Sequence, residues 1–282
     1  MQRFFSYFTG RRLITHGMLA LAMLLGMQAH AQNNTMKVLP FETLQFSLKE
    51  AGSPQISPVM GDPEKAASSI VMKMGKGDFP LHTHTANYQL VVVKGTMKHW
   101  GPDGSKEKAK PIGPGGHWYQ PAGEVHGDAC LSDECVWFIH FDGARDFALA
   151  KDSPARAHKL ETTRVQPFES LKFSKKEPGN PQIAPVRGNP EKEASSIIMK
   201  MGRGAFPLHT HTSDYQLVVI KGNMKHWGAN QTQAQAVNMA PGSYWYQPAS
   251  EVHADSCESD ECVWYITFKG PRDFAAAEVA KK

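Results

Sequence analysis

Two short histidine patterns in the 282-residue sequence have a spacing that suits a metal ion. His82-Thr-His84 occurs first and returns as His209-Thr-His211. Side chains two residues apart on a β-strand point to the same face, so each pair places two imidazole groups side by side. Imidazole nitrogen is a common ligand of divalent transition metals. Each pair therefore predicts half of a metal site.

A third histidine ends a second pattern, which lies downstream of each pair. It reads Gly-Gly-His-Trp-Tyr-Gln-Pro-Ala-Gly-Glu-Val-His over residues 115–126, and residues 242–253 repeat it with three substitutions. His82 and His209 are 127 residues apart, and so are His126 and His253. The chain therefore contains an internal repeat of two copies, and we expect one divalent ion in each copy. The expected histidine ligands are His82, His84 and His126 in the first copy and His209, His211 and His253 in the second.

Gln89 and Gln216 follow the histidine pairs at the same distance in both copies. Each is either a weak oxygen ligand or a hydrogen-bond donor beside the ligands. Three neutral imidazoles leave a divalent ion its full charge, which favours carboxylates, enolates and diketonates as bound ligands. The ligand types suit Fe, Zn, Ni or Cu, and Mn less well, so the spacing does not identify the metal.

Tyrosines next to these glutamines are the candidate proton donors to a bound substrate. Tyr88 and Tyr215 directly precede Gln89 and Gln216, and packing in the sheet is the alternative role for them. His99 and His226 lie on the strand after the following turn. Whether they face the site depends on the turn, since a one-residue shift reverses every side chain.

The elements that position these residues are short strands rich in β-branched and aromatic residues. In the first copy we expect strands at 69–74, 88–93, 97–100, 117–120 and 135–141, separated by glycine and proline. A jelly roll or small barrel hides the strand edges best at this length. Only residues 145–150 and 272–281 have a helical pattern, and each closes a copy. The sequence thus predicts an all-β protein with short terminal helices.

The repeat also gives the domain boundaries. The two copies match from Val38 and Val165 onward, and residues 151–161 belong to neither copy. We therefore expect a first domain at 32–150, a linker at 151–161 and a second domain at 162–282.

The same motifs resemble those of the cupin superfamily. Gly77-x4-His82-x-His84-x4-Gln89-x5-Gly95 is similar to the first cupin motif, and Gly115-x5-Pro121-x-Gly123-x2-His126 to the second. Because both copies carry the pair, the chain resembles a bicupin, which implies two tandem jelly-roll barrels. More narrowly, it resembles an uncharacterised bacterial cupin group named only as a domain of unknown function. The chain departs from the usual pattern in having Gln in place of the acidic ligand, and Ser250 in place of a glycine.

The first 31 residues have the features of a secretory signal. Arg3, Arg11 and Arg12 precede an apolar run at 18–27, and Ala29-His-Ala31 fits a cleavage site. The run is shorter than the roughly 20 residues that span a bilayer. We therefore expect a periplasmic or secreted protein that is not in the membrane after cleavage. Arg11-Arg12 leaves export through the general or the twin-arginine route open.

The four cysteines form two pairs of identical spacing, Cys130 with Cys135 and Cys257 with Cys262. An even count in an exported protein favours disulfides, and a four-residue hairpin loop brings the ends of each pair within reach. A Cys130 thiolate as a metal ligand is the alternative.

Charge and composition limit the class of partner. The whole sequence has 31 Lys plus Arg and 27 Asp plus Glu, and three of the basic residues lie in the leader. A nearly neutral chain without basic runs predicts neither nucleic acid nor anionic membrane as a partner. The expected partner is a small-molecule ligand, and the sequence is compatible with a homo-oligomer.

Two functions fit these features. The first is an exported metal-dependent enzyme acting on a small chelating organic acid or carbonyl compound. Its lack of an acidic ligand resembles the three-histidine dioxygenases among cupins, which implies O2 chemistry if the metal is Fe(II). The second is a non-catalytic module that binds or senses a metal or small molecule, as zinc-binding cupin domains of anti-sigma factors do.

Overall fold

The computed structural model describes residues 35–50, 52–152 and 162–277, and its secondary structure is almost entirely β-strand. The predicted signal segment and residues 153–161 of the predicted linker lie outside the described residues. No helix in the described ranges is long and apolar enough to span a membrane.

The first copy has ten strands and two short 3-10 helices, and every strand predicted for it is present within one residue of the expected bounds. These elements are β1 (Lys37–Leu39), η1 (Phe41–Thr43), β2 (Gln55–Met60), β3 (Ser68–Met74), β4 (Gly77–Thr83), β5 (Tyr88–Lys94), β6 (Met97–Trp100), β7 (His117–Gln120), β8 (His126–Cys130), β9 (Cys135–Phe141), β10 (Ala148–Leu149) and η2 (Ala150–Asp152).

The second copy repeats this order. Its elements are β11 (Arg164–Gln166), η3 (Phe168–Ser170), β12 (Gln182–Arg187), β13 (Ser195–Met201), β14 (Gly204–Thr210), β15 (Tyr215–Lys221), β16 (Met224–Gly228), β17 (Tyr244–Gln247), β18 (His253–Cys257), β19 (Cys262–Phe268) and β20 (Ala275–Ala276).

Each copy folds as a jelly roll of two facing antiparallel sheets. The first copy contributes the order β7-β5-β9-β3-β2 to a six-stranded sheet and β10-β4-β8-β6 to a four-stranded sheet, and the second copy has the matching arrangement. The turn between β5 and β6 contains Gly95 at a φ of 81°, where an added Cβ would lie 2.5 Å from the Glu134 carbonyl oxygen. Only glycine fits such a turn without strain.

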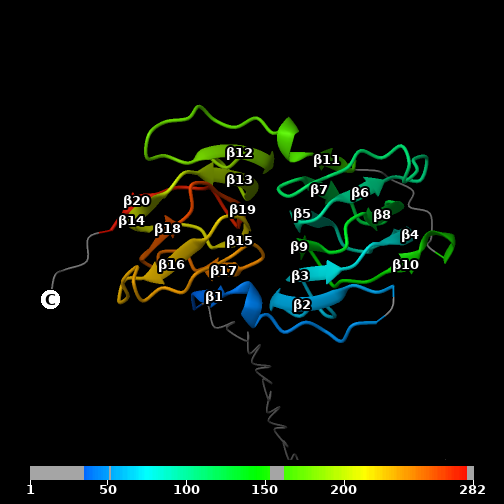
Figure 1. Ribbon diagram of the computed structural model, residues 1–282, viewed down its shortest axis with the longest axis horizontal. Helices are drawn as coiled ribbons and strands as arrows, with labels where there is room; N and C mark the ends of the chain where they lie inside the picture. Colours follow the sequence, from blue (N-terminus) through cyan, green and yellow to red (C-terminus); the bar gives the residue numbers. More distant parts are fainter. Residues whose placement is uncertain (1–34, 51, 153–161, 278–282) are drawn as a thin grey trace, which may run out of the picture. The chain divides into compact units, whose positions relative to one another are not determined.

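The two copies exchange their first strands. β1 pairs with β17 of the second copy, and β11 pairs with β7 of the first copy (Figure 1). Each six-stranded sheet is therefore completed by a strand from the other copy. The exchange closes an edge that would otherwise be exposed in each copy.

The faces of β5 show how the core is divided. Leu90 and Val92 belong to the apolar cluster inside the first barrel, whereas Val91 and Val93 pack in a cluster that also contains Val218 and other residues of the second copy. β5 is thus buried on both faces. The side chains of one face point into the barrel, and those of the other face pack against the second copy.

The predicted closing helices differ from the structure. Residues 148–149 form strand β10, which pairs with β4, and only residues 150–152 are helical, as a single 3-10 turn. In the second copy Ala275–Ala276 forms β20 against β14, and residues 278–281 lie outside the described residues. Edge pairing of these short segments with the four-stranded sheet outweighs their weak helical pattern.

Candidate metal centres

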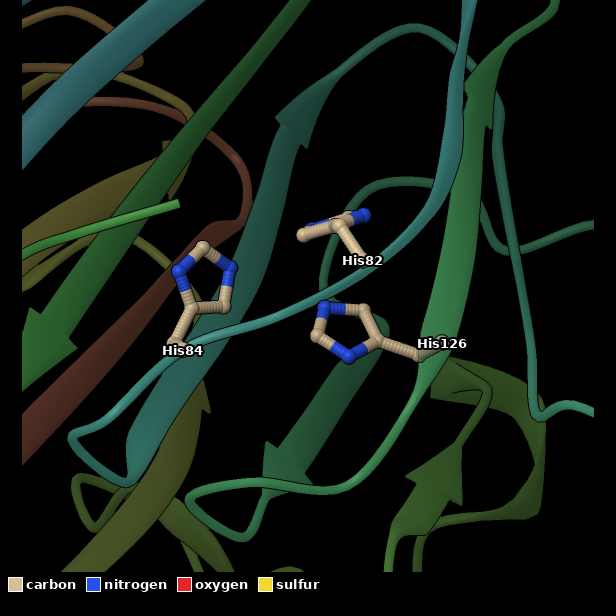
Figure 2. A group of neighbouring side chains, drawn as sticks. All are labelled: His82, His84 and His126. Carbon is tan, nitrogen blue, oxygen red and sulfur yellow. The ribbon is translucent and has the colours of Figure 1, made fainter. Parts of the chain in front are cut away.

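The three expected histidines of the first copy lie together inside the barrel. His82 near the end of β4 and His126 at the start of β8 are directly paired across the sheet, and His84 follows β4 by one residue. Figure 2 shows the three rings gathered around one space. One nitrogen of each ring lies within 4.8 Å of the others. A closure of a few tenths of an ångström brings them within about 4.2 Å, the largest separation for two ligands bonded at 2.1 Å to one ion.

A β-bulge turns the histidines toward this space. The register of β4 on β8 shifts between Phe79 and His82, where Pro80 lacks the N–H group that a regular ladder needs. The Pro80 carbonyl instead accepts a hydrogen bond of 2.7 Å from Nδ1 of His82. The bulge thereby fixes both the direction of the His82 ring and its tautomer.

The other two rings are fixed in the same way. Nδ1 of His84 donates to the Asp146 carbonyl, and Nδ1 of His126 donates to the Glu124 carbonyl at 3.0 Å. With Nδ1 committed as a donor, Nε2 of each ring carries the lone pair. Three such lone pairs fit a borderline divalent ion such as zinc or ferrous iron.

The second copy repeats this geometry. Nδ1 of His209 donates to the Pro207 carbonyl at 2.8 Å, and Nδ1 of His253 donates to the Glu251 carbonyl at 2.9 Å. The ring centroids of His209 and His253 are 4.2 Å apart, against 4.1 Å for His82 and His126. His211 completes the group, again within 4.8 Å.

Burial keeps the imidazoles of His84, His126 and His253 neutral at physiological pH. Desolvation lowers the pKa of His84 to about 4 and that of His126 to about 3, and it also lowers the pKa of His253 to about 3. The neutral form is the one that binds a metal, so the sites need lose no proton from these rings at pH 7.

Tyr88 lies against the first site. Its hydroxyl group donates a hydrogen bond of 3.0 Å to Nε2 of His126 and accepts one of 3.3 Å from the indole N–H group of Trp118. Burial raises the pKa of Tyr88 well above its usual value, so it remains a proton donor. Tyr215 makes the same two contacts in the second copy, at 3.1 and 3.3 Å.

Gln89 and Gln216 are not brought to the histidines. Gln89 Oε1 accepts a hydrogen bond of 3.3 Å from the hydroxyl group of Tyr265, and Gln216 Oε1 accepts one of 2.6 Å from Ser69. Each bond crosses from one copy to the other. Because neighbouring residues on a strand face opposite ways, Tyr88 takes the barrel face of β5 and Gln89 the face toward the other copy. The expectation that the glutamines lie beside the metal is therefore wrong in this structure.

Asp128 is a site residue that the sequence reasoning missed. It lies two residues after His126 on β8, and its Oδ2 is 3.8 Å from Nε2 of His126 and 3.9 Å from Nε2 of His82. Its Oδ1 is 2.6 Å from Nδ1 of His99, which places His99 next to the site but not among the three converging rings. Side chains two residues apart on a strand share a face, as His82 and His84 do. The same rule applied to His126 would have indicated Asp128.

The cavity in front of the first histidine group is mainly apolar and has a volume of about 560 Å³. Leu90, Trp118 and Phe141 line its interior, and Phe147 stacks on His82 at the wall with ring centroids 4.5 Å apart. Arg145 adds a positive charge to the lining and has no ion pair within the part of the chain that the structure describes.

The corresponding cavity of the second copy is much smaller, at about 50 Å³. Its lining includes His209, His211, Arg272 and Phe274, which are the counterparts of first-copy residues. This volume holds a few water molecules, whereas the first cavity accommodates a small organic ligand.

Both predicted disulfides, Cys130–Cys135 and Cys257–Cys262, are present, and the described residues include no free cysteine. The alternative of a Cys130 thiolate ligand is thereby excluded.

Comparison with known families matches both copies to one model. The model described as a domain of unknown function (DUF4437) matches residues 45–150 and 172–280. Among curated proteins, the DNA damage-repair/toleration protein DRT102 of Arabidopsis thaliana is 32% identical over 95 residues, which is 33% of this chain and 30% of that protein. The chain thus spans less than a third of the length of this relative.

Solved structures with a similar fold are bicupins of low sequence identity. A candidate dioxygenase from Nostoc punctiforme has a TM-score of 0.66 at 11% identity, covering 88% of each chain. An oxalate decarboxylase from Lactobacillus farciminis, solved as a formate complex, has a TM-score of 0.59 at 14% identity, covering 85% of this chain and 88% of that one. Oxalate decarboxylase from Bacillus subtilis has a TM-score of 0.56 at 17% identity, covering 86% and 78%. At these identities the likeness establishes the bicupin fold alone.

Proposed function

The chain belongs to the family of the domain of unknown function DUF4437, and we propose that it is an exported, metal-dependent enzyme acting on a small organic acid or chelating carbonyl compound. The observation that carries the proposal is that one ring nitrogen each of His82, His84 and His126 lie within 4.8 Å of one another, while His82 and His84 line a mainly apolar cavity of about 560 Å³. A divalent ion held by these atoms supplies Lewis-acid polarisation of a substrate oxygen and, as Fe(II), reactivity toward O2.

Arg145 supports recognition of an anion, in a lining that also contains the carboxylates of Glu50, Asp78 and Asp128. Arg145 is the positively charged side chain of the lining, and guanidinium groups pair well with carboxylates. Leu90, Phe141 and Phe147 exclude water around the remainder of the ligand. A substrate that carries a carboxylate beside a second oxygen satisfies both the arginine and the metal ligands.

Tyr88 is the proton donor in this proposal. Its hydroxyl proton is bound by Nε2 of His126, the same atom that a metal requires. Occupation of that lone pair frees the hydroxyl group to donate to an oxygen atom of the substrate. The Trp118 N–H group holds the tyrosine oxygen in place meanwhile.

Metal content is the first test. Purified protein should contain two divalent ions per chain by plasma mass spectrometry, one ion after His82→Ala or His209→Ala, and none in the double variant. His140→Gln is the matched control. His140 is partly buried, forms a hydrogen bond with Ser69 and belongs to neither of the two histidine groups. Two ions in the double variant would refute the assignment.

Turnover is the second test. Protein loaded with Fe(II), Mn(II) or Zn(II) is screened with small carboxylates and diketones for O2 uptake and for product. With any substrate found, Tyr88→Phe should lower kcat about 100-fold, within the range of general acid catalysis, without loss of metal. Arg145→Gln should raise KM for carboxylates more than for neutral diketones.

A non-catalytic binding module is the second candidate, and the small cavity of the second copy favours it there. A metal at His209, His211 and His253 has room for water but not for an organic substrate. Absence of turnover with every metal, together with retention of two ions, would support this function for the whole chain.

Export is a separate part of the proposal. The two disulfides support it, since such bonds persist in oxidising compartments. N-terminal sequencing of the protein recovered from the periplasm or medium should begin near Gln32.

A further inference from the structure

Asp128 presents one carboxylate oxygen to the same two atoms that are left free for a metal. Its Oδ2 lies 3.8 Å from Nε2 of His126 and 3.9 Å from Nε2 of His82, and it lines the cavity of the first copy. His99 contacts the other carboxylate oxygen, Oδ1. Oδ2 makes no hydrogen bond within the described residues. We propose that Asp128 is the fourth protein ligand of the first metal centre, and Asp255 that of the second. The proposal rests on the metal-dependent function proposed above.

The distances fit a shared ion. Nitrogen and carboxylate ligands lie about 2.0–2.2 Å from zinc, so two ligands of one ion are at most about 4.2–4.4 Å apart. Both distances from Asp128 Oδ2 fall inside this limit, whereas Asp128 is not in the group whose ligand atoms all lie within 4.8 Å, so a shared ion requires Asp128 and His84 to move closer together. In the second copy Oδ2 of Asp255 lies 3.7 Å from Nε2 of His209. The acidic ligand that the first cupin motif lacks at Gln89 is thus supplied from β8, two residues after the last histidine.

His99 holds the carboxylate in this orientation. Its Nδ1 is 2.6 Å from Oδ1 of Asp128, and its Nε2 is 3.1 Å from Oε1 of Gln120. The amide nitrogen of Gln120 donates to the Glu124 carbonyl at 3.2 Å, which fixes Oε1 as the atom facing His99. Both ring nitrogens of His99 therefore face polar partners, and these two contacts hold the ring against the Asp128 carboxylate.

The ring of His99 also stacks on the indole of Trp118, with ring centroids 5.0 Å apart. His226, Asp255, Gln247 and Trp245 repeat the arrangement in the second copy.

The test uses Co(II), whose visible spectrum reports its ligands, in the His209→Ala variant, which retains only the first centre. In that background Asp128→Asn should weaken Co(II) binding at least about tenfold in competition with a chelator, and should change the absorption bands. His99→Gln keeps an N–H donor for Oδ1 of Asp128 in the glutamine amide and should leave the bands in place. Asp78→Asn is the matched control: Asp78 lies at the cavity lining but forms an ion pair with Lys106 at 2.6 Å, so binding and spectrum should not change.

The outcomes separate the two proposals. Unchanged affinity and bands in Asp128→Asn would overturn the fourth ligand and leave the metal-dependent function standing. If the bands change equally in Asp78→Asn, the effect of Asp128→Asn is a general effect of removing a carboxylate near the cavity, and the proposal is also overturned. Failure of the His209→Ala parent to bind Co(II) would refute both. Should Asp128→Asn not fold, a structure of the metal-loaded full chain decides: Oδ2 at about 2.0–2.2 Å from the ion supports the ligand, and a distance beyond about 3 Å contradicts it.

Discussion

Tyr265 of the second copy donates its hydroxyl proton to Oε1 of Gln89 in the first copy, over 3.3 Å and 176 residues of sequence. Both groups are buried. In the opposite direction, Oε1 of Gln216 in the second copy accepts a hydrogen bond of 2.6 Å from Ser69 of the first copy. The same oxygen accepts one of 3.2 Å from Tyr244 of its own copy. The two barrels therefore share a polar interface inside an apolar one, and each copy supplies partners that the other copy needs.

Substitution of Gln89 should affect stability but not metal content. Gln89→Ala removes one partner of the Tyr265 hydroxyl group, whose other side-chain partners are Ser196 and Thr267, and should lower the free energy of unfolding by about 1 kcal/mol. Tyr265→Phe removes all three contacts and should cost more. Urea unfolding measures both effects, and plasma mass spectrometry should still find two ions per chain. Loss of one ion in Gln89→Ala would restore glutamine as a ligand.

Neither copy should fold well alone. A chain ending at residue 150 lacks β11, so β7 has a free edge and β1 has no partner strand. The buried residues Val91, Val93 and Phe138 would also become exposed. We expect residues 32–150 to aggregate or to dimerise by mutual exchange of β1, as measured by light scattering, whereas the chain 32–282 should be well behaved. A stable monomer of 32–150 with a cooperative unfolding transition would contradict this.

The histidine groups could be predicted from the sequence because the spacing of the histidines is a local property. His82 and His84 share a face by the two-residue period alone, and the disulfides needed only a hairpin loop of the right length. The repeat then fixed the fold, since two copies of the same short-strand pattern leave few architectures.

Other features depend on information that the local pattern lacks. The run from Tyr88 to Val93 is buried on both faces, so hydrophobicity does not show whether Tyr88 or Gln89 faces the barrel. The exchange of β1 and β11 could not be predicted either. Their sequences, Lys-Val-Leu and Arg-Val-Gln, lie at matching places in the two copies, and either copy offers the same edge strand.

Acid should destabilise the metal-free protein in part through His117. Burial lowers the pKa of His117 to about 3 from the ordinary value of 6.5. Above pH 6.5 the ring is neutral in both the folded and the unfolded chain, and it contributes nothing to the pH dependence. Below pH 6.5 the unfolded chain takes up a proton that the folded chain does not, so stability falls until about pH 3.

His117→Tyr tests this contribution, because the second copy has Tyr244 at the equivalent position. At pH 5 the buried ring costs about 2 kcal/mol on the linkage relation, so the loss of stability between pH 7 and pH 5 should be smaller by that amount in the variant. Urea titrations at both pH values measure it. Parallel pH curves for the two proteins would show that another group is responsible.

The two metal centres should bind an ion alike and differ in access. The rings, their carbonyl partners, the tyrosine and the aspartate are repeated with nearly equal distances, so His82→Ala and His209→Ala should each leave one site with affinities within about thirtyfold, roughly 2 kcal/mol.

The cavities of about 560 and 50 Å³ are not alike. Acetylacetone added to the Co(II) forms should therefore shift the absorption of His209→Ala, which retains the first centre, and leave that of His82→Ala unchanged. Equal shifts would show that the second cavity opens to organic ligands, and unequal metal affinities would show that the copies differ in the ligands themselves.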